Sequence, residues 1–332
     1  MQKKHNQVDI KLLESEILNG DIKSISKALT LIESNLPQYH NLGNELVNSL
    51  TKHKKNSLRI GITGVPGVGK STFIEALGEH LLDQNHKIGI LAIDPSSQKT
   101  KGSILGDKTR MENLSQNTNV FIRPTPSSGT LGGVAKATRE SITILEAAGY
   151  DIILIETVGV GQSEISVGAM VDFFLLLMIP GAGDELQGIK RGIMEMADGI
   201  VINKAEGENE KKAMLAKNQL ENALHLFPLP ESSQATRVML CSALHKKAID
   251  KVWKGIQVHL NKNKKSNYFE HRRANQAVFW FKEAVKQELE TSFFQNEIVK
   301  ANWQNFEEDV ANQKLSPFSA AKQIIEKQTP KQ

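Results

Sequence analysis

The sequence predicts an α/β fold in which a mostly parallel sheet is covered by helices on both faces. Two observations lead to this prediction. From residue 58 onward, short β-rich apolar segments alternate with segments of helical apolar spacing. The β-rich segments are almost continuously apolar, which is typical of parallel strands buried on both faces. Ligands of such sheets bind at the carboxyl ends of the strands, so the residues that follow each strand are the candidates for a site.

The expected elements divide the chain into three parts. Residues 1–55 show helical spacing, interrupted at Gly20 and Asp21, and a basic linker at residues 51–57 follows. The strands are expected at residues 58–63, 87–93, 119–123, 150–155, 173–179, 199–203 and 238–241. A polar hinge at 261–267 then precedes helices at 269–289 and 296–310 and a third that begins at Ser316 and Pro317. We therefore expect an N-terminal helical extension (1–55), an α/β domain (56–262) and a C-terminal helical arm (263–332).

Residues 64–71 fit the phosphate-binding pattern G-x-x-x-x-G-K-[ST] at every required position, with a strand before it and a helix after it. Backbone N–H groups of such a loop point at phosphate oxygens, and the helix N-terminus adds positive potential. Lys70 is expected to reach the β- and γ-phosphates, and the Ser71 hydroxyl to bind Mg²⁺. The sequence therefore predicts a P-loop that binds a nucleoside triphosphate through Gly64, Val65, Pro66, Gly67, Val68, Gly69, Lys70, Ser71 and Thr72.

Carboxylates follow two further strands. Asp94 ends the second strand, where it would hold a Mg²⁺-bound water or orient an attacking one, although a turn cap explains it equally well. Residues 101–111 are polar and punctuated by glycine, as in a switch loop, and place Asp107 near the metal and Arg110 near phosphate. Glu156 comes directly after the fourth strand, with Gly159 three residues on. This spacing is similar to the metal and γ-phosphate sensor of GTPases, and a buried Glu without such a task would be costly.

Two loops remain at the carboxyl edge. Residues 180–192 form a glycine-hinged loop that carries Lys190, and either a functional switch or a solvated connection explains it. Residues 203–206 resemble the guanine-reading pattern N-K-x-D, with Glu206 in the place of Asp. Asn203 would bond the base, Lys204 would lie along the ring, and Glu206 would accept from guanine N1–H and the 2-amino group. Adenine lacks these donors and would be rejected by about 10⁴-fold. Ser242 and Ala243 match the element whose backbone contacts guanine O6.

Composition limits the other functions. The net charge of +4 is small for 332 residues, which argues against nucleic acid as a partner. A single cysteine, Cys241, excludes an internal disulfide and a multi-cysteine metal site, and we expect it to be a buried small residue. The first residues lack the apolar core of a signal peptide, and no apolar run is long enough to span a bilayer. We therefore expect a cytoplasmic protein with no membrane partner.

With these motifs in this order, the chain resembles the MeaB/ArgK family of GTPases, which are companions of methylmalonyl-CoA mutase and are also labelled LAO/AO (lysine–arginine–ornithine) transport ATPases. The matching sequence segments cover most of the chain. They include Gly20-Asp21, residues 61–71, 94–97, 102–111, 126–133, 156–164 and 181–190, with 269–273 and Trp280-Phe281 in the arm.

This resemblance implies a metallochaperone-like P-loop GTPase that uses GTP and Mg²⁺ and releases GDP. Its implied partner is an adenosylcobalamin-dependent acyl-CoA mutase, which it would assist, protect or reactivate while gating cofactor delivery. The loop at 181–191 would be a switch that communicates with the mutase, through Gln187 and Lys190. The C-terminal arm would form a homodimer. The alternative explanation for its aromatic residues is that they pack on their own domain.

The expected chemistry is in-line attack of water on the γ-phosphate. Lys70, Mg²⁺ on Ser71, and the carboxylates Asp94, Asp107 and Glu156 would organise the charge, with Arg110 or Lys190 added on loop closure. Three alternatives remain at this point. The first is a metal-insertion GTPase of hydrogenase or urease maturation, against which the single Cys and scattered His argue. The second is an ATP-using kinase or ATPase linked to lysine–arginine–ornithine transport, and the third is a non-catalytic binding module.

Overall fold

The computed structural model describes residues 8–34, 36–53, 55–94, 111–126, 131–157, 163–181 and 191–328. It consists of two compact units, Met1–Ala274 and Asn275–Gln332, and each is described here by itself. The boundaries expected at residues 55 and 262 stay predictions.

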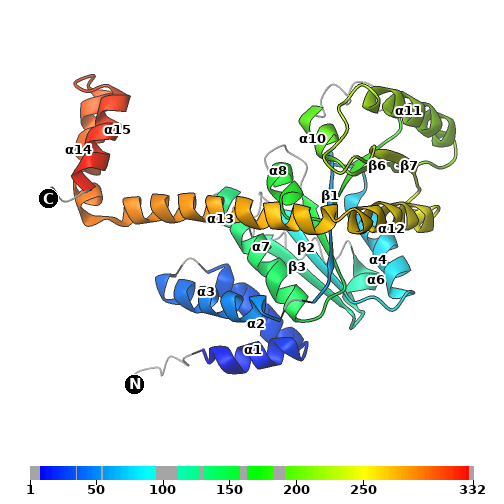
Figure 1. Ribbon diagram of the computed structural model, residues 1–332, viewed down its shortest axis with the longest axis horizontal. Coiled ribbons are helices and arrows are strands. Elements are labelled where there is room, and N and C mark those ends of the chain that lie inside the picture. The colour runs from blue at the N-terminus through cyan, green and yellow to red at the C-terminus, as the bar shows by residue number, and fades with distance from the viewer. Residues whose placement is uncertain are drawn as a thin grey trace. The chain divides into compact units, whose positions relative to one another are not determined.

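The first unit is built on a seven-stranded parallel sheet in the order β3-β2-β4-β1-β5-β6-β7 (Figure 1). This confirms the predicted α/β P-loop fold, with all seven expected strands present. β3 is longer than expected, because Pro124 and Pro126 fall on a strand at the sheet edge, where proline is tolerated. The strands are β1 (Leu58–Gly64), β2 (Ile88–Asp94), β3 (Val120–Pro126), β4 (Ile152–Thr157), β5 (Phe173–Met178), β6 (Gly199–Ile202) and β7 (Arg237–Leu240).

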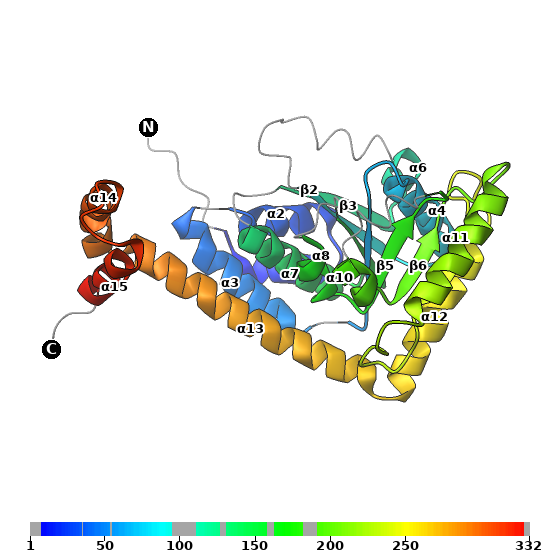
Figure 2. The ribbon, with the colours of Figure 1, turned by 90° about the horizontal axis from the view of Figure 1, so that it is seen from above.

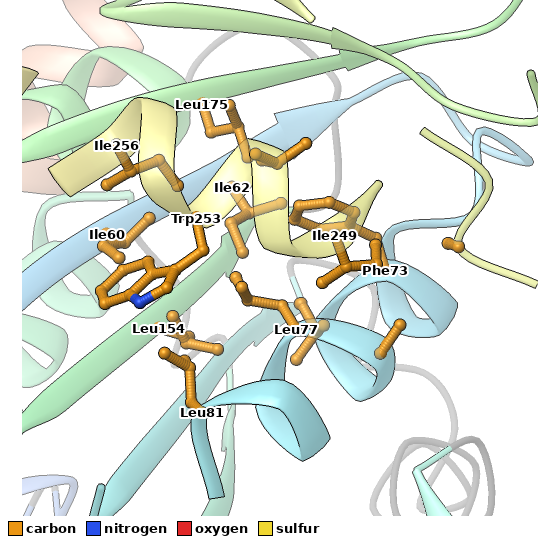
Figure 3. Packing of buried hydrophobic residues seen from close by; sticks show 14 of the residues in the cluster. Ile60, Ile62, Phe73, Leu77, Leu81, Leu154, Leu175, Ile249, Trp253 and Ile256 are labelled. Atoms are coloured by element: carbon orange, nitrogen blue, oxygen red, sulfur yellow. The ribbon is translucent and has the colours of Figure 1, made fainter. Parts of the chain in front are cut away.

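Helices cover both faces of the sheet, as the apolar strands predict. On one face Ile60, Ile62 and Leu175 pack against Phe73 and Trp253 (Figure 3). This face carries α4 (Lys70–Leu82), α6 (Glu112–Ser115) and α12 (Ile249–Lys265). The opposite face carries α7 (Leu131–Ala147), α8 (Ser163–Gly168), α10 (Arg191–Met196) and α11 (Asn209–Leu224).

Three aspartates fix the amino ends of the strands in the same way. Asp151 donates its N–H to the Lys87 carbonyl and accepts the Lys87 N–H on Oδ2, both at 2.8 Å. Asp172 exchanges the same two bonds with Arg59, and Asp198 exchanges them with Phe174. Each aspartate therefore ties the start of its own strand to the start of the neighbouring strand.

The N-terminal helices belong to the same unit and pack on α7 (Figure 2). They are α1 (Ile10–Leu18), α2 (Ile22–Ile32) and α3 (Pro37–Thr51). Asp9 and Asp21 cap α1 and α2 with their side chains. Gly20 adopts φ +79° between them, in the break that the sequence predicts.

The expected polar hinge at 261–267 is mostly wrong, because α12 continues to Lys265 and only Ser266 and Asn267 separate it from α13 (Tyr268–Gln295). Lysines in the last turn of α12 interact favourably with the negative end of the helix, so their polarity does not break it. Arg272 and Arg273, in the first turns of α13, bind the side chains of Asp198 and Asp172, with the closest contacts at 2.9 and 2.6 Å.

The second unit holds the rest of α13 together with α14 (Glu297–Ala311) and α15 (Pro317–Gln328). α14 and α15 pack against each other, and Val299 and Ile324 are buried in this unit. Large apolar side chains remain exposed, including Phe281 and Phe318. None of the described helices in either unit is both long enough and apolar enough to be a membrane span.

Candidate nucleotide site

The phosphate loop joins the end of β1 to the start of α4, and its glycines are required by geometry. Gly69 has φ +90°, and a Cβ there would lie 2.8 Å from the Asn203 Nδ2 atom. Gly64 has φ +154°, and a Cβ there would lie 2.5 Å from the Leu177 carbonyl oxygen. A side chain at either position would be both strained and obstructed. The backbone of this loop therefore requires glycine at both positions.

Lys70 begins α4 and folds back along this loop. Its Nζ donates to the Gly64 carbonyl oxygen at 2.8 Å and to that of Val65 at 3.4 Å. Burial lowers the pKa of Lys70, and the carboxylates of Glu156 and Glu164 oppose that shift. Among the described residues the first turn of α4 has no acidic side chain, so Lys70 and the helix N-terminus together favour an anion.

Ser71 and Glu156 meet beside the loop. The Ser71 hydroxyl donates to Glu156 Oε1 at 3.4 Å, and Glu156 is paired with Ile62 of β1 across the sheet. Thr157 donates to the Thr63 hydroxyl at 2.8 Å and holds the ends of the two strands together. A hydroxyl and a carboxylate are oxygen ligands of the kind that Mg²⁺ prefers, so the residues fit that ion. The described side chains hold no cluster of three metal-binding groups, and Asp94 and Asp107 are not among them.

Asn203, which follows β6, connects three parts of the site. Its Nδ2 donates to the Val68 carbonyl oxygen at 2.9 Å, and its Oδ1 accepts the Ala243 N–H at 2.9 Å. Lys204 adopts φ +57°, and its Nζ donates to the Gly67 carbonyl oxygen at 2.8 Å. The phosphate loop and the two base-reading segments are therefore held in one arrangement.

Glu206 carries an unsatisfied acceptor. Its Oε2 atom is buried and has no hydrogen-bond partner in the part of the chain that the structure describes. A buried carboxylate oxygen of this kind is costly unless a donor reaches it. The N1–H and 2-amino groups of guanine are such donors, so the orphaned oxygen fits a guanine base.

Cys241 is a buried residue at the base of this region, as predicted. The residue is 2% exposed, and its Sγ atom lies 3.6 Å from Asn203 Oδ1. Burial, together with the charge of Glu206, raises the pKa of Cys241 to about 12. The thiolate that a nucleophile needs is therefore absent at neutral pH. Ser242 is fully buried in a tight turn that presents the backbone of Ala243.

The carboxyl edge thus brings together the phosphate loop, Glu156 and the base-reading residues from four segments. Thr72 lies exposed in the first turn of α4. Asp107, Arg110, Gly159 and Lys190, with the side chain of Asp94, lie outside the described residues, so their roles stay predictions. Sequence reasoning did not select Glu164 of α8, which is buried and acts electrostatically on Lys70. Its position just after a glycine-rich loop is the signal that was available.

Comparison with known proteins identifies the family. The model of the family described as methylmalonyl Co-A mutase-associated GTPase MeaB matches residues 25–298. A probable GTPase from Mycobacterium tuberculosis is 44% identical over 326 residues, which cover 98% of this chain and 97% of that protein. GTPase ArgK from Escherichia coli is 43% identical over 307 residues, covering 92% and 93%.

Two further relatives agree. The mouse protein named methylmalonic aciduria type A homolog, mitochondrial, is 38% identical over 323 residues, covering 94% of this chain and 78% of that protein. The crystal structure of an LAO/AO transport system kinase superposes with a TM-score of 0.75 at 34% identity, covering 97% of this chain and 99% of the other. The chain therefore belongs to the MeaB family of methylmalonyl-CoA mutase-associated GTPases.

Proposed function

We propose that this GTPase is a chaperone of an adenosylcobalamin-dependent acyl-CoA mutase, which it assists, protects or reactivates while gating delivery of the cofactor. The observation that carries the guanine part of this proposal is the buried Oε2 of Glu206, three residues after the fixed Asn203. The mutase part is supported by the description of the family and by the name of the mouse relative. On this proposal the chain acts in the cytoplasm.

The proposed reaction is in-line attack of water on the γ-phosphate of GTP, which yields GDP and phosphate. Lys70 moves from the carbonyl oxygens of Gly64 and Val65 to the β- and γ-phosphates, whose charge stabilises its ammonium form. Ser71 and Glu156 would hold Mg²⁺. When bound, that ion would supply positive charge to the phosphates. Asp94 and Asp107 complete this set in the proposal, with Gly159 at the γ-phosphate.

In this proposal the guanine base is recognised by the residues that follow β6 and β7, and not by the phosphate loop. Asn203 is held by two protein hydrogen bonds, so its orientation is fixed before the base arrives. Lys204 lies along the ring, Glu206 accepts from the guanine donors, and the backbone of Ala243 meets O6. Because the Asn203 side chain is already ordered, little conformational entropy is lost when the base binds.

Coupling to the mutase requires a change in hydrolysis rate. Unassisted small GTPases turn over at roughly 10⁻⁴ s⁻¹, and a well-placed arginine accelerates them by about 10³–10⁵-fold. We propose slow basal hydrolysis that the mutase accelerates by ordering the loops that carry Arg110 and Lys190. We also propose that residues 263–332 form the arm of a homodimer, because residues 275–332 leave many apolar side chains exposed.

The test is steady-state hydrolysis of GTP and of ATP, each with and without a purified adenosylcobalamin-dependent acyl-CoA mutase. We expect preference for GTP and acceleration by the mutase, and loss of hydrolysis in Lys70→Ala. Turnover that excess mutase leaves unchanged would contradict the coupling. Preference for ATP would contradict the guanine assignment and favour the transport-kinase alternative. Light scattering of the full chain tests the dimer.

A further inference from the structure

A second concave region lies at the β7 edge of the sheet, outside the nucleotide site. We call it the β7 groove: it is lined by β7, α10, α11, α12 and the segment at residues 226–236 between α11 and β7. Its volume is about 1230 Å³, large enough for a peptide segment. None of the nucleotide-site residues named above lines it, so the proposed function does not explain it.

β7 is able to accept another strand. It is the last strand in the sheet order, and Cys241, which follows it, donates to Ile202 of β6. Because neighbouring residues of a strand point their backbone groups in opposite directions, Val238 and Leu240 present N–H and C=O groups away from β6. The described part of the chain places no strand on that side.

The opposite edge strand, β3, is protected against pairing with another chain, whereas β7 is not. On β3 the outward positions alternate from Val120, whose N–H is already bonded to the Asn117 carbonyl at 3.0 Å. The same alternation places Pro124 and Pro126 on the outward side, where proline has no N–H to offer. Edge strands without such protection are templates for pairing with another chain.

The two walls of the β7 groove differ in chemistry. The α12 wall carries Lys251, Lys254, Val258 and Lys262 at helical spacing, and in the described structure none of these lysines forms an ion pair. The α11 wall lies on the other face of the sheet and includes the apolar side chains of Leu224 and Phe227. The whole lining has five Lys or Arg and three Glu, and none of the three Glu is on α12.

The position of Lys251 is unfavourable for the helix itself. It lies in the first turn of α12, where the positive end of the helix disfavours a cation. Lys262 lies in the last turn, where the negative end of the helix stabilises a cation. The helix end does not stabilise Lys251 or Lys254 in this way, so binding of an anionic group in the groove is a reason for their charge.

We propose that the β7 groove binds an extended acidic segment of a partner protein, which pairs with β7 as an added strand. Side chains of a strand point alternately to its two faces. The segment would place carboxylates against the lysines of α12 and apolar side chains against Leu224 and Phe227 of the α11 wall. Backbone hydrogen bonds to Val238 and Leu240 would supply affinity, and the alternation would supply specificity.

The experiment measures fluorescence anisotropy of a labelled seven-residue peptide that alternates Glu and Val, with the full chain. Three probes separate the sources of binding: this peptide, the same peptide with Lys in place of Glu, and an acidic peptide N-methylated at alternate nitrogens. The protein variants are Lys251→Glu/Lys254→Glu and, as a matched charge control, Lys11→Glu/Lys23→Glu, which changes two exposed lysines of α1 and α2. GTP hydrolysis and the melting temperature report whether each variant is folded.

We expect the acidic peptide to bind and the Lys peptide not to bind. N-methylation on the paired side should abolish binding, and Lys251→Glu/Lys254→Glu should weaken it by about tenfold, with the control variant unchanged. No binding of the acidic peptide would overturn the proposal and leave these lysines as protection of the edge. Equal binding of the methylated peptide would overturn strand pairing, and equal binding to both double variants would overturn the charge match. Displacement by inorganic phosphate at constant ionic strength would assign the groove to small anions instead.

Discussion

Replacing Glu206 by Gln tests the guanine assignment at a single atom. Oε2 of Glu206 is buried and has no partner among the described residues, so the exchange removes no described hydrogen bond within the protein. The melting temperature should therefore not fall, and loss of the uncompensated buried charge should raise it. In the complex, however, a charged acceptor becomes an amide whose NH₂ group faces the donors of guanine.

The size of the effect follows from the bond that is lost. A hydrogen bond to a charged group contributes about 1.5–3 kcal/mol, which corresponds to a Kd for GTP that is weaker by roughly 10–150-fold. Xanthine has a carbonyl in place of the 2-amino group, and the Gln amide can donate to it. Affinity for xanthosine triphosphate should therefore rise while affinity for GTP falls. Competition against a fluorescent guanine nucleotide measures both values, with ATP as reference.

The matched control is Glu208→Gln, which removes a charge from an exposed residue of the same loop. It should leave both affinities unchanged. If Glu206→Gln binds GTP within about twofold of the parent, Glu206 does not read the base, and the orphaned oxygen needs another explanation. If both variants weaken GTP equally, the loop acts through its net charge.

Three further outcomes follow from the geometry. Gly69→Ala should lose most nucleotide binding, because φ +90° is strained for alanine and its Cβ would lie 2.8 Å from Asn203; isothermal titration with GDP measures the loss. Asp172→Asn should destabilise the first unit by about 1.5–3 kcal/mol in urea unfolding, because the half-buried guanidinium of Arg273 loses its hydrogen-bonded carboxylate. Glu221→Gln, at the partly exposed pair with Lys217, should cost less than about 1 kcal/mol. Cys241 should resist a thiol reagent at pH 8 in the folded chain. Because its pKa is raised from 9.0 to about 12, its contribution to stability is intact below pH 9 and declines above it, which thermal melts between pH 8 and 10 should detect.

Local patterns predicted the elements whose conformation depends on nearby residues. The phosphate loop is one case, since glycines at fixed spacing and the flanking apolar runs determine strand, turn and helix together. The hinge at 261–267 was predicted wrongly because polarity was interpreted as a break in the helix. Lysines near a helix C-terminus stabilise it, and only Asn267, with φ +57°, ends the pattern.

Long-range contacts were beyond prediction. The guanine pattern identified Asn203, but not that its amide would join Val68 to Ala243, which lie 135 and 40 residues away in sequence. Arg272 and Asp198 form an ion pair although 74 residues separate them in sequence. From the sequence alone, each of these charged residues is expected at the surface. A single sequence has no signal for such pairs, because any charged residue nearby in space would satisfy the same chemistry.

The paired bonds of Asp151, Asp172 and Asp198 have a consequence for the length of the strands. These bonds align the amino ends of the strands. The number of residues in each strand therefore sets how far from this edge the following loop lies. From Leu58 to Gly64, β1 raises the phosphate loop by roughly 20 Å, and one residue more or less would move it by about 3.3 Å. Hydrogen bonds to phosphate tolerate only a few tenths of an ångström. Insertions within β1, β5 or β6 therefore cannot be absorbed, and changes in chain length must fall in the loops beyond the strand ends.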